Sequence, residues 1–204
     1  MNPGKDMEQA MSDGVPPNLA ENGPEARIAA ALGRRSVVLV GMMGAGKSSV
    51  GRRLAGRLGV PFVDADAEIE SAAAMTIAEI FARHGEPEFR KGEARVIARL
   101  LDSGPQVLAT GGGAVMDPAT RALIAEKSIS IWLKADLEVL LRRTKRRAER
   151  PLADRISSLL PQREPFYAQS DITVISRDDP HDTVVEDVIA ELEKKLVPVM
   201  EKQQ

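Results

Sequence analysis

The loop at residues 41–48, which reads GMMGAGKS, limits the possible folds of this chain more than any other segment. It matches G-x-x-x-x-G-K-[ST] at every fixed position. An apolar run at 37–40 precedes it and predicts a strand, and apolar residues at helical spacing over 48–58 follow it. The glycines let the backbone curl so that successive N–H groups point at phosphate oxygens, and the following helix adds its positive dipole end. A chance glycine-rich turn would not need a strand and a helix around it. The pattern therefore predicts a nucleoside triphosphate site.

Each polar residue of this loop has a predicted role. Lys47 places a cation on the β- and γ-phosphates, and the Ser48 hydroxyl binds Mg²⁺, a hard ion that takes few protein ligands. The motif alone does not separate a kinase from an ATPase, a GTPase or a regulatory switch. The nucleotide-binding residues predicted here are Gly44, Ala45, Gly46, Lys47, Ser48 and Ser49.

Strand and helix patterns alternate along the rest of the chain. β-Branched and apolar runs predict strands, and apolar residues at helical spacing predict helices between them. Alternation of this kind implies a parallel sheet covered on both faces, so the predicted class is α/β, a three-layer α/β/α domain with five parallel strands. The expected strands are 37–40, 61–64, 106–110, 128–133 and 172–175, and the expected helices are 48–58, 65–74, 76–84, 88–101, 118–125, 137–147, 155–166 and 184–196.

One domain accounts for most of the 204 residues. We expect a disordered arm over 1–33, because its first 24 residues are rich in Gly, Pro, Asn, Asp and Glu, although 24–32 could form one or two helical turns. The predicted domain is 34–197, with a mobile lid at about 148–160, and 198–204 is a tail.

Composition narrows the range of partners. The net charge of -2 argues against a general nucleic-acid binder, and the absence of cysteine excludes disulfides, thiolate metal sites and a catalytic thiol. No apolar run approaches the roughly 20 residues of a membrane helix, and the N-terminus lacks the pattern of a secretory signal. We therefore expect a cytoplasmic monomer that binds small molecules, with no nucleic-acid or membrane partner.

Five later motifs accompany the loop. They are FVDAD at 62–66, EFRK at 88–91, TGGGA at 110–114, ERPL at 149–152 and QREPFY at 162–167. In order and spacing, from about residue 36 to 196, the chain resembles the shikimate kinases, small members of the nucleoside-monophosphate-kinase-like P-loop group. The resemblance implies transfer of the γ-phosphoryl of MgATP to the 3-hydroxyl of shikimate, giving shikimate 3-phosphate and ADP in aromatic amino acid biosynthesis.

Two carboxylates, Asp64 and Asp66, follow the second predicted strand. The resemblance implies that Asp64 supports the Mg²⁺ shell through water and that Asp66 accepts hydrogen bonds from shikimate hydroxyls, near the one that is phosphorylated. Whether Asp66 is a general base or only orients the hydroxyl stays open. The alternative for the pair is capping of the following helix, since an aspartate there accepts from free N–H groups.

The resemblance assigns the acceptor carboxylate to Arg90 and Arg163, and a guanidinium can give a carboxylate two parallel hydrogen bonds. Glu93 lies at i+3 from Arg90 and could hold its orientation. By the same resemblance Phe81 and Phe89 wall the carbocycle. The alternatives are a solvated arginine on a helix face at 90 and plain core packing for both phenylalanines.

Three glycines, Gly111, Gly112 and Gly113, remove every side chain where the family holds the shikimate ring, so a ligand can approach the backbone. The alternative is a flexible loop. The resemblance makes Arg150 the lid arginine that neutralises charge as the phosphoryl group moves, and it lays Arg143 against the adenine or its phosphates. The adjacent basic residues Arg142, Lys145, Arg146 and Arg147 fit a solvated helix face.

The adenine loop departs from the family pattern. An apolar-Asp-Thr sequence is usual, whereas this chain has Ser176 at the aspartate position and a shorter path to Pro180, the predicted adenine contact. The sequence therefore leaves open whether the preference for ATP over other nucleotides is strict. Two other functions remain open: a P-loop kinase of another hydroxy acid such as gluconate, and a non-catalytic nucleotide-binding regulator.

Overall fold

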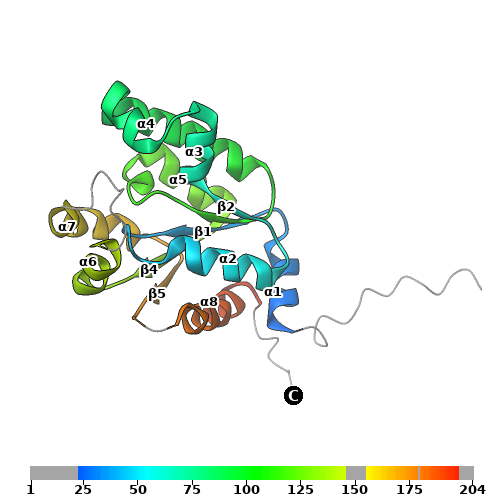
Figure 1. The fold of residues 1–204 in the computed structure, drawn as a ribbon. Helices are drawn as coiled ribbons and strands as arrows, with labels where there is room; N and C mark the ends of the chain where they lie inside the picture. Colours follow the sequence, from blue (N-terminus) through cyan, green and yellow to red (C-terminus); the bar gives the residue numbers. More distant parts are fainter. Residues whose placement is uncertain (1–22, 146–154, 179, 198–204) are drawn as a thin grey trace, which may run out of the picture.

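A computed structural model describes residues 23–145, 155–178 and 180–197 (Figure 1). Within them five strands form one parallel sheet in the order β2-β3-β1-β4-β5, which confirms the predicted fold class. The strands are β1 Ser36–Val40, β2 Phe62–Asp64, β3 Val107–Ala109, β4 Ser128–Lys134 and β5 Ile172–Ile175.

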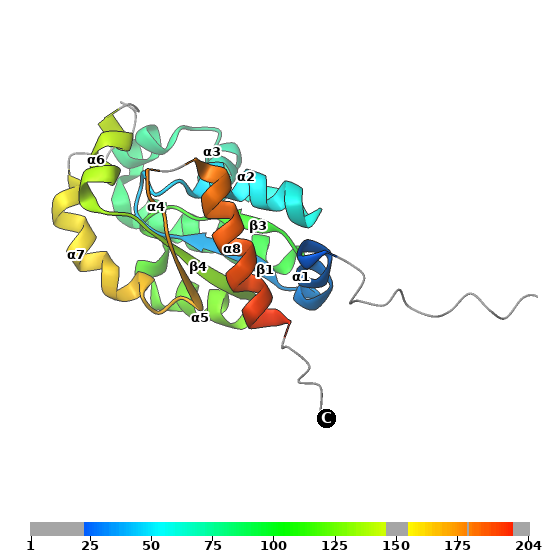
Figure 2. The ribbon, with the colours of Figure 1, turned by 90° about the horizontal axis from the view of Figure 1, so that it is seen from below.

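Helices cover both faces of this sheet. Figures 1 and 2 place α1, α2 and α8 on one face and α4 and α5 on the other, while α6 and α7 lie side by side. The helices are α1 Pro24–Leu32, α2 Lys47–Leu58, α3 Ala65–Ala73, α4 Ile77–Asp102, α5 Pro118–Lys127, α6 Leu137–Lys145, α7 Ile156–Tyr167 and α8 His181–Leu196, with a short 3₁₀ turn, η1, at Ala114–Met116. No helix in the described ranges is long and apolar enough to cross a bilayer.

Strand β1 lies at the centre of the sheet, and all five of its residues are buried, as a strand covered on both faces requires. Strands β3 and β2 end at the same edge of the sheet as β1. Leu39 of β1 pairs with Ala109 of β3, and Ala109 pairs in turn with Asp64 of β2. The segments that follow β1, β2 and β3 therefore meet at the carboxyl edge of the sheet, where open α/β sheets bind ligands.

Helix α1 corrects the predicted domain boundary. Residues 24–32 belong to the folded domain, because Ile28 and Leu32 are buried with 0% and 2% of their surface exposed. The helix packs on α8, where Arg27 pairs with Glu193. Pro24 at the first helical position and the i, i+4 spacing of the two aliphatic residues are the local signals for it. Residues 1–22 of the predicted arm lie outside the described residues.

Removing α1 should destabilise the domain. A chain that begins at residue 34 loses two buried aliphatic side chains, each worth about 1.5–3 kcal/mol as an upper value. At about 2–4 °C per kcal/mol for a domain of this size, the melting temperature should fall by at least about 5 °C. Thermal unfolding followed by circular dichroism measures this, with a chain that begins at residue 23 as the control. Equal melting temperatures for the two chains would show that α1 adds nothing to the core.

Helix α4 joins the two helices expected at 76–84 and 88–101. Gly85, with φ 79° and ψ 168°, breaks the helical geometry between them, and Thr76 with Glu79 caps the start in a reciprocal capping box. Around the kink, Ile69, Ile80 and Phe89 form a second small core between α3 and α4. This core supports the segment that carries Arg90.

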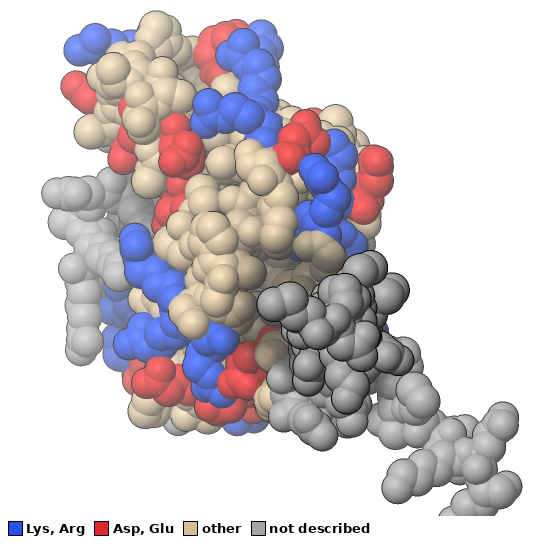
Figure 3. All heavy atoms as spheres, turned by 90° about the vertical axis from the view of Figure 1, so that its right-hand side faces the viewer, with Lys and Arg blue, Asp and Glu red and all other residues tan. Residues whose placement is uncertain are grey.

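Charged side chains of both signs are intermingled on the surface shown in Figure 3. Arg57 of α2 illustrates the pairing, because it contacts Glu25 of α1 and Glu186 of α8. Exposed pairs of this kind contribute little each, about 0–1 kcal/mol. Their effect here is to tie three helices of one layer together.

Candidate active site

A cavity of about 570 Å³ opens at the carboxyl edge of the sheet. It brings together the phosphate-binding loop, both predicted carboxylates, the glycine loop and the segment after β5. The lining residues are Gly44, Gly46, Lys47, Ser48, Ser49, Asp64, Asp66, Thr110, Gly112, Arg143, Thr144, Asp178, Pro180 and His181.

The phosphate-binding loop has the curled backbone that its glycines predict. Gly44 and Gly46 have φ values of 86° and 95°, in the left-handed region that favours glycine. A Cβ at Gly44 would also lie 2.8 Å from the Thr144 hydroxyl oxygen. Lys47 begins α2 and is buried, and its Nζ donates to the Gly41 carbonyl at 2.8 Å. The ammonium group is thus held over the loop at the start of the helix.

Ser48 and Asp64 form the polar pair next to that loop. The Ser48 hydroxyl donates to the Asp64 carboxylate over 2.7 Å, and the other Asp64 oxygen accepts from the Asp66 amide at 3.1 Å. The helix-capping alternative is therefore correct for Asp64, and it coexists with a place on the cavity wall. The described residues contain no cluster of three or more His, Cys, Asp and Glu able to hold a metal. One hydroxyl and one carboxylate fit Mg²⁺, which keeps several waters.

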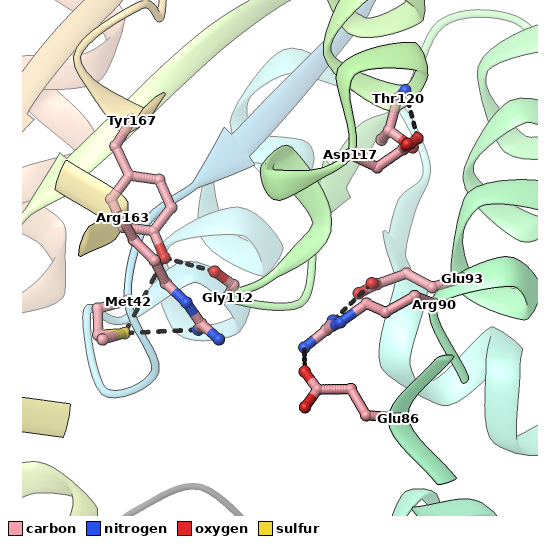
Figure 4. A network of polar contacts seen from close by, with 9 residues as sticks. All are labelled: Met42, Glu86, Arg90, Glu93, Gly112, Asp117, Thr120, Arg163 and Tyr167. Carbon is pink, nitrogen blue, oxygen red and sulfur yellow. Dashed lines mark hydrogen bonds and ion pairs between the residues drawn. The ribbon is translucent and has the colours of Figure 1, made fainter. Parts of the chain in front are cut away.

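Arg90 is held by carboxylates on two sides (Figure 4). Its Nη1 donates to Glu93 at 2.6 Å and its Nη2 donates to Glu86 at 3.0 Å, while its guanidinium lies 4.9 Å from the centre of the Phe89 ring. The hydrogen bond to Glu93 is the support that the i+3 spacing predicts, and with 25% of its surface exposed the Arg90 side chain is partly buried and not fully solvated. Burial raises the pKa of Glu93, and Arg90 opposes that shift.

The three glycines allow side chains to approach from both sides. A Cβ at Gly111 would lie 2.6 Å from Glu93 Oε1 and 2.9 Å from Asp66 Oδ1, and one at Gly113 would lie 2.5 Å from the Arg90 guanidinium. No side chain fits at these two positions without displacing a charged group. Close approach therefore requires glycine here, which a merely flexible loop would not explain.

Arg163 faces Arg90 across the site. It comes from α7 and is only 5% exposed, and Figure 4 shows the two guanidinium groups directed into the space between them. Its Nη1 lies 3.9 Å from the Met42 sulfur. A thioether sulfur is a weak hydrogen-bond acceptor, so this contact does not satisfy the buried guanidinium. A carboxylate, which can accept two parallel hydrogen bonds, would suit it better.

Arg143 is tied to two loops of the cavity. Its Nη1 donates to the Ser176 hydroxyl at 3.1 Å and to the Gly44 carbonyl at 3.3 Å, and its Nη2 donates to the Arg177 carbonyl. Ser176, the departure from the family sequence, is thus a hydrogen-bond partner of the predicted nucleotide arginine. Pro180, the predicted adenine contact, lines the same cavity.

The outcome differs for two further sets of predicted site residues, the two phenylalanines and the lid. The tilted rings of Phe81 and Phe89 pack with centroids 4.8 Å apart in the second core, and Phe89 is buried, so core packing holds for Phe89. Arg150 and most of the predicted lid fall in 146–154, outside the described residues. The last lid residues, 156–160, form the first turns of α7.

Comparison of the sequence with known proteins shows the family to which the chain belongs. A family profile described as shikimate kinase matches residues 43–193. A shikimate kinase from Bradyrhizobium diazoefficiens is 60% identical over 192 residues, which cover 91% of this chain and 92% of that protein. The chain belongs to the shikimate kinase family. Its members are ATP-dependent kinases, so the family settles the reaction class that the loop motif left open.

Structural comparison agrees with the family. A shikimate kinase from Acinetobacter baumannii in complex with shikimate superposes with a TM-score of 0.79 at 33% identity, covering 83% of this chain and 99% of that one. A gluconokinase from Sinorhizobium meliloti has a TM-score of 0.54 at 22% identity, covering 80% of this chain and 94% of that one, and shows the fold alone. Shikimate kinases are therefore the nearer group of the two.

The family motifs assign no role to Tyr167 or Met42. Both contact the glycine-loop side of the site, because the Tyr167 hydroxyl donates to the Gly112 carbonyl and lies 3.9 Å from the Met42 sulfur. The local signal for Tyr167 is its i+4 spacing from Arg163, which puts both on one face of α7.

Proposed function

We propose that this protein transfers the γ-phosphoryl of MgATP to the 3-hydroxyl of shikimate, forming shikimate 3-phosphate and ADP. One observation carries the proposal. The cavity joins the phosphate-binding loop to Asp66 and Gly112, and two guanidinium groups flank the same glycine loop. A phosphate donor site and an anionic acceptor site thus share one edge of the sheet.

The acceptor carboxylate would lie between Arg90 and Arg163. Glu93 and Glu86 fix the first guanidinium, so little rotamer freedom remains to be lost when a ligand binds. Asp66 would accept from the acceptor hydroxyls, and the backbone of 111–113 would donate to the ligand. Phe81 and Phe89 would act mainly by supporting the apolar wall beneath the ring.

The nucleotide would lie along the other half of the cavity. Backbone N–H groups of 44–49 and the Lys47 ammonium would bind the phosphates, and Arg143 with Pro180 would contact the adenine. Ser48, and Asp64 through water, would hold Mg²⁺. When bound, the ion neutralises charge on the phosphate oxygens.

Positioning and charge neutralisation supply most of the catalysis in phosphoryl transfer. Asp66 lies beside the glycine loop, where its carboxylate would orient the acceptor hydroxyl or take its proton. Arg150 would neutralise charge on the transferring group, and closure of the lid over 148–160 would exclude water and limit ATP hydrolysis. We also propose that the protein acts as a monomer in the cytoplasm.

Asp64→Asn tests the metal site. Asparagine also caps helices well, so the start of α3 should survive the change. Loss of the carboxylate charge should raise the Mg²⁺ concentration for half-maximal rate by about 10–100-fold, as changes near metal sites do. Initial rates against free Mg²⁺ measure it. Asp102→Asn, at an exposed ion pair with Lys127, is the control. If both variants showed the same Mg²⁺ dependence, Asp64 would not be part of the metal site.

The acceptor itself is tested by product analysis. ATP is incubated with the protein and either shikimate or gluconate, and phosphorus and proton NMR identify the ester and the hydroxyl that carries it. A phosphate monoester at the 3-position of shikimate is expected, with no gluconate product. A gluconate ester would favour the other small-molecule kinase, and no ester with either acceptor would favour a non-catalytic regulator.

A further inference from the structure

Tyr167, the only tyrosine in the sequence, is the last residue of α7 and is 1% exposed. Its hydroxyl donates to the Gly112 carbonyl and lies 3.9 Å from the Met42 sulfur (Figure 4). Three segments far apart in the sequence therefore meet at one phenol oxygen: the phosphate-binding loop, the glycine loop and α7.

Arg163 shares these neighbours. Its Nη1 lies 3.9 Å from the Met42 sulfur, and a Cβ at Gly112 would lie 3.4 Å from it. Burial raises the pKa of Tyr167 to about 12, and the nearby Arg163 acts in the opposite direction. The phenol therefore stays protonated near neutral pH and can donate to the carbonyl.

The glycine loop needs such an anchor. Residues 111–113 have no side chains, so the loop cannot be fixed by its own packing, and glycine has the most backbone freedom to lose. A hydrogen bond to the central carbonyl sets the direction in which the neighbouring N–H groups point. Phenylalanine would fill the same buried space, so packing alone does not require the hydroxyl.

We propose that Tyr167 is a positioning residue of the acceptor site, whose hydroxyl fixes the glycine loop against Arg163 and the phosphate-binding loop. This inference rests on the proposed function, because the positioned groups are those that would bind the acceptor. It gives the hydroxyl a role in acceptor affinity that is separate from nucleotide binding.

Tyr167→Phe keeps the ring and removes only the hydroxyl. The KM for shikimate should rise about tenfold, which corresponds to about 1.4 kcal/mol, while the KM for ATP stays within about twofold. Trp132→Phe is the matched control, because Trp132 packs 6.0 Å from the Tyr167 ring and its replacement leaves the hydroxyl in place. Thermal melts and ADP titration show that each variant is folded.

Arg163→Lys combined with Tyr167→Phe tests the coupling. The shikimate KM of the double variant should rise by a smaller factor than the product of the factors measured for the two single variants, because the two groups act together. An unchanged shikimate KM in Tyr167→Phe, an equal rise in both KM values, or multiplicative losses would each overturn the positioning role. A wild-type protein without shikimate-dependent ADP formation would instead overturn the proposed function, and this inference with it.

Discussion

Replacing Arg150 with alanine is expected to lower kcat about a thousandfold and to change the KM for shikimate by less than about tenfold. An arginine that contacts the transferring phosphoryl group acts mainly in the transition state, so its loss affects the rate more than ground-state binding. Catalytic arginines in phosphoryl transfer contribute factors of this size. Steady-state kinetics with shikimate and ATP varied in turn give both parameters.

Two neighbouring substitutions make the Arg150 test specific. Arg150→Lys should recover little, since one ammonium cannot bridge two oxygens as a planar guanidinium does. Arg147→Ala removes the same charge three residues away and should stay near wild type. Equal losses in Arg147→Ala and Arg150→Ala would mean that the lid supplies only diffuse positive potential.

Arg90→Ala should nearly abolish shikimate binding and leave ADP affinity unchanged. Losing one partner of a buried charge pair costs about 2–5 kcal/mol, which is roughly thirtyfold to several thousandfold in affinity. Calorimetric titration with both ligands measures the two affinities. Lys91→Ala is the control, because Lys91 is the adjacent cation and pairs with Glu88 on the exposed side of α4. Wild-type shikimate affinity in Arg90→Ala would refute the assignment.

The same variant should show a new pH dependence of stability. Burial already raises the pKa of Glu93, and Arg90 is the cation that offsets this. Without Arg90 the folded-state pKa rises further above the unfolded value, so the neutral carboxyl is favoured in the fold. The stability that this gives is present at low pH and lost as pH rises through the folded pKa. Melting temperatures compared at about pH 5 and pH 8 should therefore fall with pH more in Arg90→Ala than in wild type.

Local patterns were sufficient for much of the fold and for part of the site. The buried run of β1, the phosphate-binding loop and the helix after it each carry their own signal, and parallel topology then brings Ser48 and Asp64 to one edge. The Arg90–Glu93 pair was also predictable, because i+3 spacing on a helix is a local relation.

Contacts between distant segments were not predictable in this way. Ile28 and Leu32 lie in a short alanine-rich segment after a polar stretch, and only the packing of α1 on α8 and α2 shows that the two side chains are buried. Tyr167 reaches a carbonyl 55 residues away, and Ser176 meets an arginine 33 residues before it. No residue pattern within one helix or loop specifies such partners, because tertiary packing selects them.

Shikimate-dependent ADP formation would show that one cavity uses ATP to phosphorylate shikimate. A coupled assay records ADP release by the full chain with MgATP, first alone and then with shikimate added. We expect a low rate without shikimate and a saturable increase with it, which is lost in Arg90→Ala. ADP release that is the same with and without shikimate would mean that shikimate is not the acceptor.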